Sequence, residues 1–473
     1  MKLATLALAL SGWAVAQHAP STLPKVKFTD TRLDNGLRVL ISEDHFAPVY
    51  AICVSYKVGS KDERPGRTGF AHLFEHMMFK GSENVGVGEL DFLIYTNGGS
   101  SNGTTNNDRT SYFETLPKNQ LDLGLYLEAD RMRGLVLNQE NLENQRQAVK
   151  EERRQSYDNQ AYGQTSEKLE ELIYDGFPYH HSVIGSMADL DAASVDDVKA
   201  FFKTYYAPNN AVLALVGDLD TQATLAKVKK YFGNIPAQTP PKAVDFTEPP
   251  KTGEPRRTTI QDPLARLARL DIAYRFGPSS EADARALSVA ASILAGGGGG
   301  FGGRGGGGGG NISRLYQLLV QDKEIASNVS ARADRRQGPG FFHISVTLRP
   351  GKTPAEAEAL ISEEIAKLQT APVTAKELDR THMALRRAAE GRLTSLSRAQ
   401  ALADAAAVYN DPERVNSETD AQLAVTAADI QKAARNQLVE ANKVVVITAP
   451  GASGGGGRGG RGGRGGGDRQ SND

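Results

Sequence analysis

Two histidines and a glutamate in the stretch Thr68–Phe79 are spaced as metal chemistry would require. If the stretch is a helix, His72 and His76 lie one turn apart, so both imidazoles can reach one point in space. Glu75 leans toward the same point from the position before the second histidine. The opposite side of the helix carries an apolar stripe: Phe70, Leu73, Phe74, Met77 and Met78. Two neutral imidazoles and a carboxylate in the order His-x-x-Glu-His indicate a metal site of the inverted zincin type.

A third ligand is expected, because a catalytic zinc site has about three protein ligands and keeps one position for water. The stretch 141–154 looks helical, and its spacing places four residues on one face: Gln145, Ala148, Val149 and Glu152. The apolar pair Ala148 and Val149 marks that face as the inward one. A carboxylate beside core residues needs a partner, since burying an unpaired charge is costly. We therefore predict Glu152 as the third ligand, with Glu151 as the alternative.

The chain resembles the pitrilysin or insulinase family of inverzincin zinc metallopeptidases, which includes insulin-degrading enzyme and the mitochondrial processing peptidase. Four residues match the family's motif, with the family's separation before the last of them: His72, Glu75, His76 and Glu152. The stretches Gly98–Tyr112 and Pro178–Gly185 are also similar to the family. The likeness covers nearly the whole chain after its first residues. It indicates the mitochondrial-processing-peptidase-like branch, with the chain as a bacterial, exported subunit.

The resemblance implies one Zn²⁺ per chain, bound by His72, His76 and Glu152. Glu75 is then the general base, which takes a proton from the attacking water and passes it to the leaving amine. The strand that begins at Asn102 resembles the family's edge strand, whose free backbone groups pair with an extended peptide. Contacts with substrate are therefore expected at three residues: Asn102, Gly103 and Thr104. Because such pairing reads the peptide backbone, we expect a zinc metalloendopeptidase with broad specificity for unfolded peptides.

Two departures from the family concern residues beyond the metal. Catalysis in the family usually also needs an Arg and a Tyr from the second half, and the matching positions here are Val320 and Ser327. Gln145 also stands where several branches keep a second glutamate. We therefore expect a heterodimer in which a homologous subunit supplies the Arg/Tyr pair, with a homodimer as the second choice. The alternative function is a noncatalytic scaffold or a peptide-capture subunit with a structural zinc.

Strands and helices follow each other without regular alternation, which is typical of an α+β fold. Strands are predicted at Thr31–Leu33, Arg38–Ile41, Val49–Val58, Asn102–Thr105, Thr110–Glu114 and Ala211–Val216. Further helices are predicted at Glu89–Thr96, Gln120–Met132, Glu140–Tyr157 and Thr221–Phe232. His180 and His181 fall in a loop, where we expect a structural role and not metal binding.

The chain is expected to contain two homologous mixed α/β domains, each a sheet with helices packed on it, at 26–233 and 258–450. A proline-rich linker at 234–257 joins them. The resemblance implies that the two domains face each other as half of a clamshell chamber.

Two segments of the second domain repeat segments of the first. Leu267–Gly277 reads like Val49–Gly59, and Asn442–Ile447 matches Asn210–Leu215. Carried forward, this register places apolar residues where the motif residues His72, Glu75 and His76 stood: Ala290, Ile293 and Leu294. The second domain therefore cannot bind a metal in the same way.

The remaining segments limit location and partners. Met1–Ala16 reads as a secretory signal peptide, and no later run reaches the ~20 apolar residues of a membrane span, so we expect an exported protein, periplasmic or secreted. Gly296–Gly310 and the Gly/Arg-rich tail 451–473 are expected to be a flexible loop and a disordered tail. Cys53, the one cysteine, cannot form an internal disulfide and is expected to be buried. The net charge of −1 argues against a nucleic-acid partner.

Overall fold

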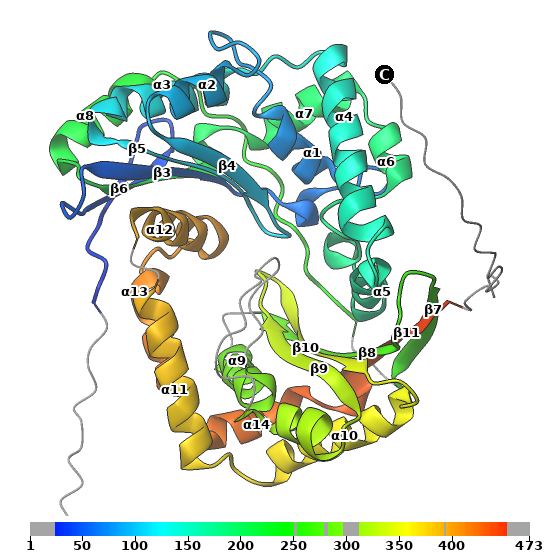
Figure 1. Ribbon diagram of the computed structural model, residues 1–473. Helices are drawn as coiled ribbons and strands as arrows, with labels where there is room; N and C mark the ends of the chain where they lie inside the picture. Colours follow the sequence, from blue (N-terminus) through cyan, green and yellow to red (C-terminus); the bar gives the residue numbers. More distant parts are fainter. Residues whose placement is uncertain (1–23, 250–252, 279–281, 297–311, 392–393, 452–473) are drawn as a thin grey trace, which may run out of the picture.

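The computed structural model describes residues 24–249, 253–278, 282–296, 312–391 and 394–451 (Figure 1). The expected signal peptide, nearly all of the glycine-rich loop and nearly all of the tail lie outside these ranges. No helix within them is long and apolar enough to cross a membrane.

The first sheet has six strands in the order β1-β2-β6-β3-β5-β4. Its strands are β1 (Thr29–Arg32), β2 (Arg38–Glu43), β3 (Val49–Tyr56), β4 (Ser100–Thr105), β5 (Thr110–Pro117) and β6 (Ala211–Gly217). β2 and β6 run parallel, and the other neighbours are antiparallel. β4 therefore forms one edge of the sheet, with β5 as its neighbour on the inner side.

The second sheet has five strands in the order β7-β11-β8-β10-β9. They are β7 (Arg256–Asp262), β8 (Arg269–Pro278), β9 (Ala326–Asp334), β10 (Pro339–Leu348) and β11 (Lys443–Pro450). β7 and β11 run parallel and the others antiparallel, so this sheet repeats β2-β6-β3-β5-β4 strand for strand. Ile52 pairs with Leu215 in the first sheet, and Ile272 pairs with Val445 in the second. The predicted α+β fold with an internal duplication is thus confirmed.

Helices cover the outer faces of both sheets (Figure 1). The first half contains α1 (Phe70–Met77), α2 (Glu89–Thr96), α3 (Leu121–Arg133), α4 (Gln139–Arg153), α5 (Gly163–Ile173), α6 (Met187–Asp191), α7 (Val195–Tyr205) and α8 (Thr221–Phe232). The second contains α9 (Ala282–Ala295), α10 (Pro354–Thr370), α11 (Ala375–Glu390), α12 (Ser395–Tyr409), α13 (Arg414–Leu423) and α14 (Ala427–Gln437). Capping boxes define the starts of several of them; Thr353 and Glu356, for example, satisfy the free N–H groups at the start of α10.

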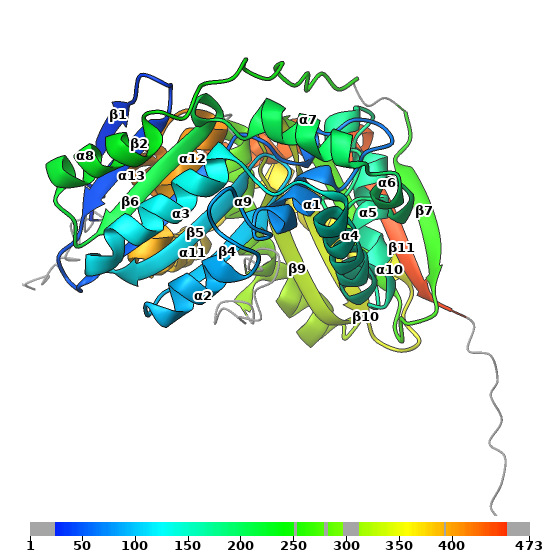
Figure 2. The same cartoon turned by 90° about the horizontal axis from the view of Figure 1, so that it is seen from above.

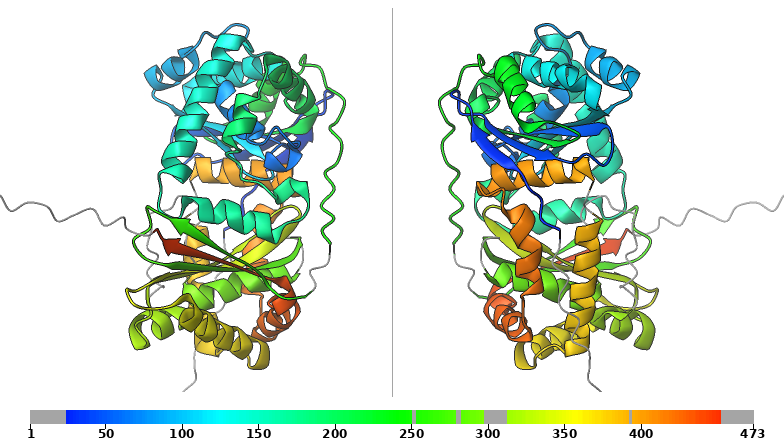
Figure 3. Two further views of the ribbon diagram at one scale, coloured as in Figure 1. Left: turned by 90° about the vertical axis from the view of Figure 1, so that its right-hand side faces the viewer. Right: turned by 90° about the vertical axis from the view of Figure 1, so that its left-hand side faces the viewer.

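One helix of each half packs on the sheet of the other half. The Ala-rich side of α12 covers the inner face of β3 and β6, where Ala399 and Ala403 meet Ala51 and Cys53. In return, Leu169 of α5 packs on the second sheet beside β8 and β11. Figure 3 shows both helices between the two halves. Because of this exchange β3 is buried on both faces, and Cys53 is buried as expected.

Most predicted elements are found within a few residues of their expected limits. α2 and α8 have the predicted bounds, and β2 begins at the predicted residue, Arg38. Two points differ. β7 begins at Arg256, inside the expected linker, because this strand pairs with β11. The predicted helix Glu140–Tyr157 ends as an α-helix at Arg153 and continues as a π-helical turn.

Candidate metal centre

α1 presents its two histidines to α4 because its other side is buried. All five residues of the apolar stripe are at most 5% exposed, and Phe74 packs against Tyr206 with ring centroids 4.3 Å apart. α1 and α4 lie side by side (Figure 2). His72 and His76 therefore face the last turn of α4, which carries Glu152.

The structure brings the three predicted ligands together. Nε2 of His72 lies 3.5 Å from Oε2 of Glu152, and Nε2 of His76 lies 3.3 Å from the same oxygen. Among the described residues, these form the one group of three that could bind a metal ion, with all ligand atoms within 4.8 Å of each other. Glu151, the alternative, is exposed and bonds instead to Arg154 and Gln155, at 3.1 and 3.0 Å.

The inward face of α4 differs in one residue from the expected set. Ala148 is exposed, whereas Val149 and Gln145 are buried. Successive residues of a helix are about 100° apart, so a helix packed along Leu142, Gln145 and Val149 leaves Ala148 at the rim. The prediction that Ala148 marks the inward side was wrong, although Glu152 still reaches the histidines.

The donor atoms fit a zinc ion. Bonds of about 2.0–2.1 Å at tetrahedral angles place neighbouring ligand atoms about 3.3 Å apart, close to the two separations from Oε2 of Glu152. Burial lowers the pKa of His72 to about 4, so its ring is neutral at pH 7, the form that binds a metal. A hydrogen bond with His76 lowers the pKa of Glu152, which keeps it a carboxylate.

Glu75 faces the edge strand. Burial raises the pKa of its carboxyl group, and a hydrogen bond from the Thr105 side chain opposes this rise. Oε2 of Glu75 is buried without a hydrogen-bond partner. The backbone of Gly103 lies so close that a Cβ there would be 3.0 Å from Cγ of Glu75. The carboxylate therefore sits between the histidines and β4 and has one oxygen free to accept a proton.

β4 directs alternate backbone groups toward its free edge. The N–H of Asn106 bonds to the carbonyl of Arg109 across the hairpin, and the pairs of an antiparallel ladder alternate from there. The backbone groups of Asn102 and Thr104 thus bond to β5. The backbone N–H and C=O groups of Ser101, Gly103 and Thr105 face away from β5, toward the free edge. Of the three expected substrate residues, Gly103 is the one with outward-facing backbone groups. Thr105, the last residue of the predicted strand Asn102–Thr105, was not among the expected substrate residues, although strand periodicity places it on the same face as Gly103.

The stretch Pro178–Gly185 supports the start of α1. The buried carboxylate of Glu63 accepts hydrogen bonds from the N–H groups of Gly69 and Ala71, at 2.9 and 2.8 Å. His181 lies 3.5 Å from Glu63, and the ring of Phe177 packs at a tilt against the His181 ring, with centroids 4.6 Å apart. This is a structural contact of the kind expected for the two loop histidines.

Gly185 connects both ligand-bearing helices. It packs directly on Gly69 before α1, and its carbonyl accepts a 2.6 Å hydrogen bond from Arg153, the residue after Glu152. A displacement of this loop would therefore move the histidines and the carboxylate relative to each other.

The second half lacks these groups at the corresponding places. Ala290, Ile293 and Leu294 are fully buried in α9. Val320 is buried, and the exposed Ser327 donates a hydrogen bond to the carbonyl of Thr347.

Comparisons with known proteins agree with this geometry. Residues 38–186 match the family model described as insulinase (peptidase family M16), and residues 192–385 match the peptidase M16 inactive domain. The zinc protease PqqE of Helicobacter pylori is 31% identical over 371 residues, covering 77% of this chain and 79% of that protein. A probable mitochondrial-processing peptidase subunit beta of Schizosaccharomyces pombe is 24% identical over 221 residues, covering 47% of this chain and 48% of that protein.

Two solved structures share the fold. The crystal structure of a protease from Helicobacter pylori superposes with a TM-score of 0.82 and 28% identity, covering 90% of this chain and 100% of that chain. The periplasmic protease PqqL from Escherichia coli superposes with a TM-score of 0.71 and 18% identity, covering 90% of this chain and 48% of that chain.

The contact of Gly185 with the start of α1 can be tested with Gly185→Ala. Gly185 and Gly351 both have a left-handed backbone, with φ of +74° and +79°, but a Cβ at 185 would lie 2.4 Å from backbone atoms of Gly69, whereas one at 351 meets nothing within 4 Å. Gly351→Ala should lower the free energy of unfolding by about 1 kcal/mol, and Gly185→Ala by at least about 2 kcal/mol. Urea unfolding measures both, and equal losses would contradict the proposed contact.

Proposed function

Because the chain belongs to the peptidase M16 (insulinase) family, we propose that it is a zinc-dependent endopeptidase that hydrolyses unfolded peptides. The observation that carries the proposal is the meeting of two imidazole Nε2 atoms and one carboxylate oxygen, from His72, His76 and Glu152, beside the outward-facing edge of β4. A Zn²⁺ bound there would polarise a peptide carbonyl and make water acidic enough to attack at neutral pH.

The residues of the chain have separate tasks in this reaction. His72, His76 and Glu152 bind the ion. Glu75 does not bind it; its unpartnered oxygen accepts the proton of the attacking water and delivers it to the leaving amine. Burial raises the pKa of Glu75 above that of an exposed glutamate, which makes it a better base.

The edge of β4 supplies the peptide-binding surface. An extended peptide that pairs with Ser101, Gly103 and Thr105 would run alongside Glu75, because Gly103 and Thr105 both contact that residue. Main-chain pairing recognises backbone, so the surface suits unfolded segments of varied sequence. We infer the location of the protein from Met1–Ala16, because the signal-peptide pattern of this segment supports export to the periplasm or the medium.

Val320 and Ser327 favour a two-subunit enzyme. Neither side chain has the positive charge or the phenolic hydroxyl that would stabilise the carbonyl oxygen from the second half. We therefore propose that a homologous subunit supplies these groups, and that this chain contributes the zinc. Without such a partner, the same surface would act as a peptide-capture module, which is the second candidate function.

The assignment of Glu152 as a ligand can be tested against its neighbour. Glu152→Gln should weaken zinc binding by at least about 100-fold, since even residues that only support ligands cost 10–100-fold when changed. Glu151→Gln should leave zinc binding unchanged, because Glu151 bonds only to Arg154 and Gln155. Competition with a fluorescent zinc chelator measures both affinities. A loss in Glu151→Gln with none in Glu152→Gln would refute the assignment.

The role of Glu75 can be tested with a fluorogenic peptide. Hydrolysis by the wild-type chain, together with its partner if one is needed, should stop with a chelator and return with zinc. Glu75→Gln should retain one zinc per chain but lower kcat by about 10²–10⁴-fold, because it removes the base and keeps the ligands. Elemental analysis measures the metal. Substantial turnover by the zinc-loaded variant would show that another group takes the proton.

The requirement for a partner can be tested with the purified chain alone. We expect it to bind zinc and an unfolded peptide but to hydrolyse that peptide far more slowly than a complex purified from the native host. Light scattering during gel filtration gives the oligomeric state of each sample. Full activity from a monomer of this chain would overturn the two-subunit proposal and leave the zinc site intact.

A further inference from the structure

The turn between β4 and β5 joins the peptide-binding edge to the second half. Asp108 in this turn accepts hydrogen bonds from the hydroxyl of Tyr179, at 2.6 Å, and from the N–H of Gln337, at 2.8 Å. Gln337 belongs to the turn between β9 and β10. The edge strand of the first sheet thus ends against a turn of the second sheet.

Arg109, the next residue, connects β4 to α12. Its Nη1 donates to the carbonyl oxygen and the hydroxyl of Thr104, at 2.9 and 2.7 Å. Its Nε lies 2.9 Å from Oδ1 of Asp404 in α12. The same carboxylate oxygen accepts hydrogen bonds from Ser55 and Ser111, at 2.8 and 2.9 Å. Asp404 is therefore fixed on the first sheet although it belongs to the second half.

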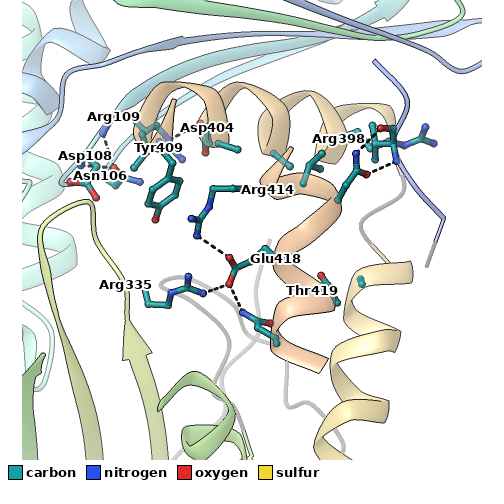
Figure 4. Close-up of a pocket in the computed structure, with 18 of the residues that line it drawn as sticks. Asn106, Asp108, Arg109, Arg335, Arg398, Asp404, Tyr409, Arg414, Glu418 and Thr419 are labelled. Carbon is teal, nitrogen blue, oxygen red and sulfur yellow. Dashed lines mark hydrogen bonds and ion pairs between the residues drawn. The ribbon is translucent and has the colours of Figure 1, made fainter. Parts of the chain in front are cut away.

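Packing alone does not hold Arg109 in place. Arg109 and Asp404 line a cavity of about 430 Å³ between α12, α13 and the β9–β10 turn (Figure 4). Because Arg109 lines this cavity, packing covers only part of its side chain, and its ion pair and hydrogen bonds help to set its position. Asp404 is the ionised partner of Arg109: the two charges attract each other at 2.9 Å, although Nε of Arg109 makes no hydrogen bond.

We propose that Asp404 positions Arg109, and that Arg109 holds the end of β4 in the geometry that binds peptide. Thr104 lies between Gly103 and Thr105, the two residues whose backbone groups face the edge and whose side-chain positions contact Glu75. The second half, which has no metal ligand in its α9, thereby contributes to peptide binding through the carboxylate of Asp404. This inference rests on the proposed peptidase function, because it assigns Arg109 as a positioning residue for the substrate.

The chain offers a matched control for the test. Arg398, in the first turn of the same α12, pairs with Asp44 of the first half at 2.5 Å. Asp44 follows β2, which three strands separate from β4 in the sheet. Asp404→Asn and Asp44→Asn each remove one charge that ties α12 to the first half. Arg109→Met tests the same contact from its other side and keeps a long side chain if Asp404→Asn fails to fold.

Hydrogen exchange and steady-state kinetics each test the contact between Arg109 and Asp404. In Asp404→Asn and Arg109→Met, the amides of Asn102 and Thr104, which bond to β5, should exchange at least about tenfold faster than in the wild type. KM for an unfolded peptide should rise about tenfold, with kcat within about twofold and zinc content unchanged, because uniform binding is lost. Asp44→Asn should match the wild type in all of these measurements.

Three outcomes would contradict the inference. Unchanged exchange at the amides of Asn102 and Thr104 in both variants would show that Arg109 does not hold β4. Equal effects in Asp44→Asn would show that only the general docking of α12 matters. A fall in kcat at constant KM would place Arg109 in the chemical step and not in peptide binding. Absence of hydrolysis by the wild-type complex purified from the native host would refute the peptidase function alone, since the exchange measurement does not depend on turnover.

Discussion

Burial of one side of α1 decides where its two imidazoles point. Five large apolar side chains of this helix are at most 5% exposed, and each is worth roughly 1.5–3 kcal/mol when buried. A rotation of the helix by one residue would remove several of them from the core. No interaction of His72 or His76 with Glu152 in water could repay that loss, so the core fixes the orientation of the ligands before any metal is present. Glu63 and Gly185 add to this by fixing where the helix begins.

The features that could be predicted from the sequence are those that depend on local spacing. The helical spacing of apolar residues in α1 predicted which side is buried and that His72 and His76 lie together on the other side. The same spacing in α4 predicted that Glu152 faces them. Strand patterns gave the two copies of the sheet, because each copy keeps the same order of apolar runs. The family resemblance supplied the roles, since spacing alone does not distinguish a base from a ligand at Glu75.

The features that could not be predicted depend on contacts between distant segments. The sequence of β3 gives no sign that α12, some 350 residues later, covers one of its faces. That contact also buries several alanines of α12. The contact between Arg109 and Asp404 cannot be recognised in the sequence, because nothing in the sequence distinguishes an Arg or Asp that forms an ion pair from one that is exposed to solvent. Ala148 was misplaced for a simpler reason: a stripe gives the buried side of a helix only to within one residue.

The exchange of α5 and α12 also sets an order for biosynthesis. The last strand of the first sheet ends at Gly217, but α12, the helix that covers its inner face, begins only at Ser395. At about 5–20 residues per second, the ribosome needs roughly 10–40 s to make the intervening chain. During that interval Cys53, Ala214 and their neighbours have no cover from their own polypeptide. The nascent first half must therefore be shielded by a chaperone or stay incompletely folded until the second half emerges.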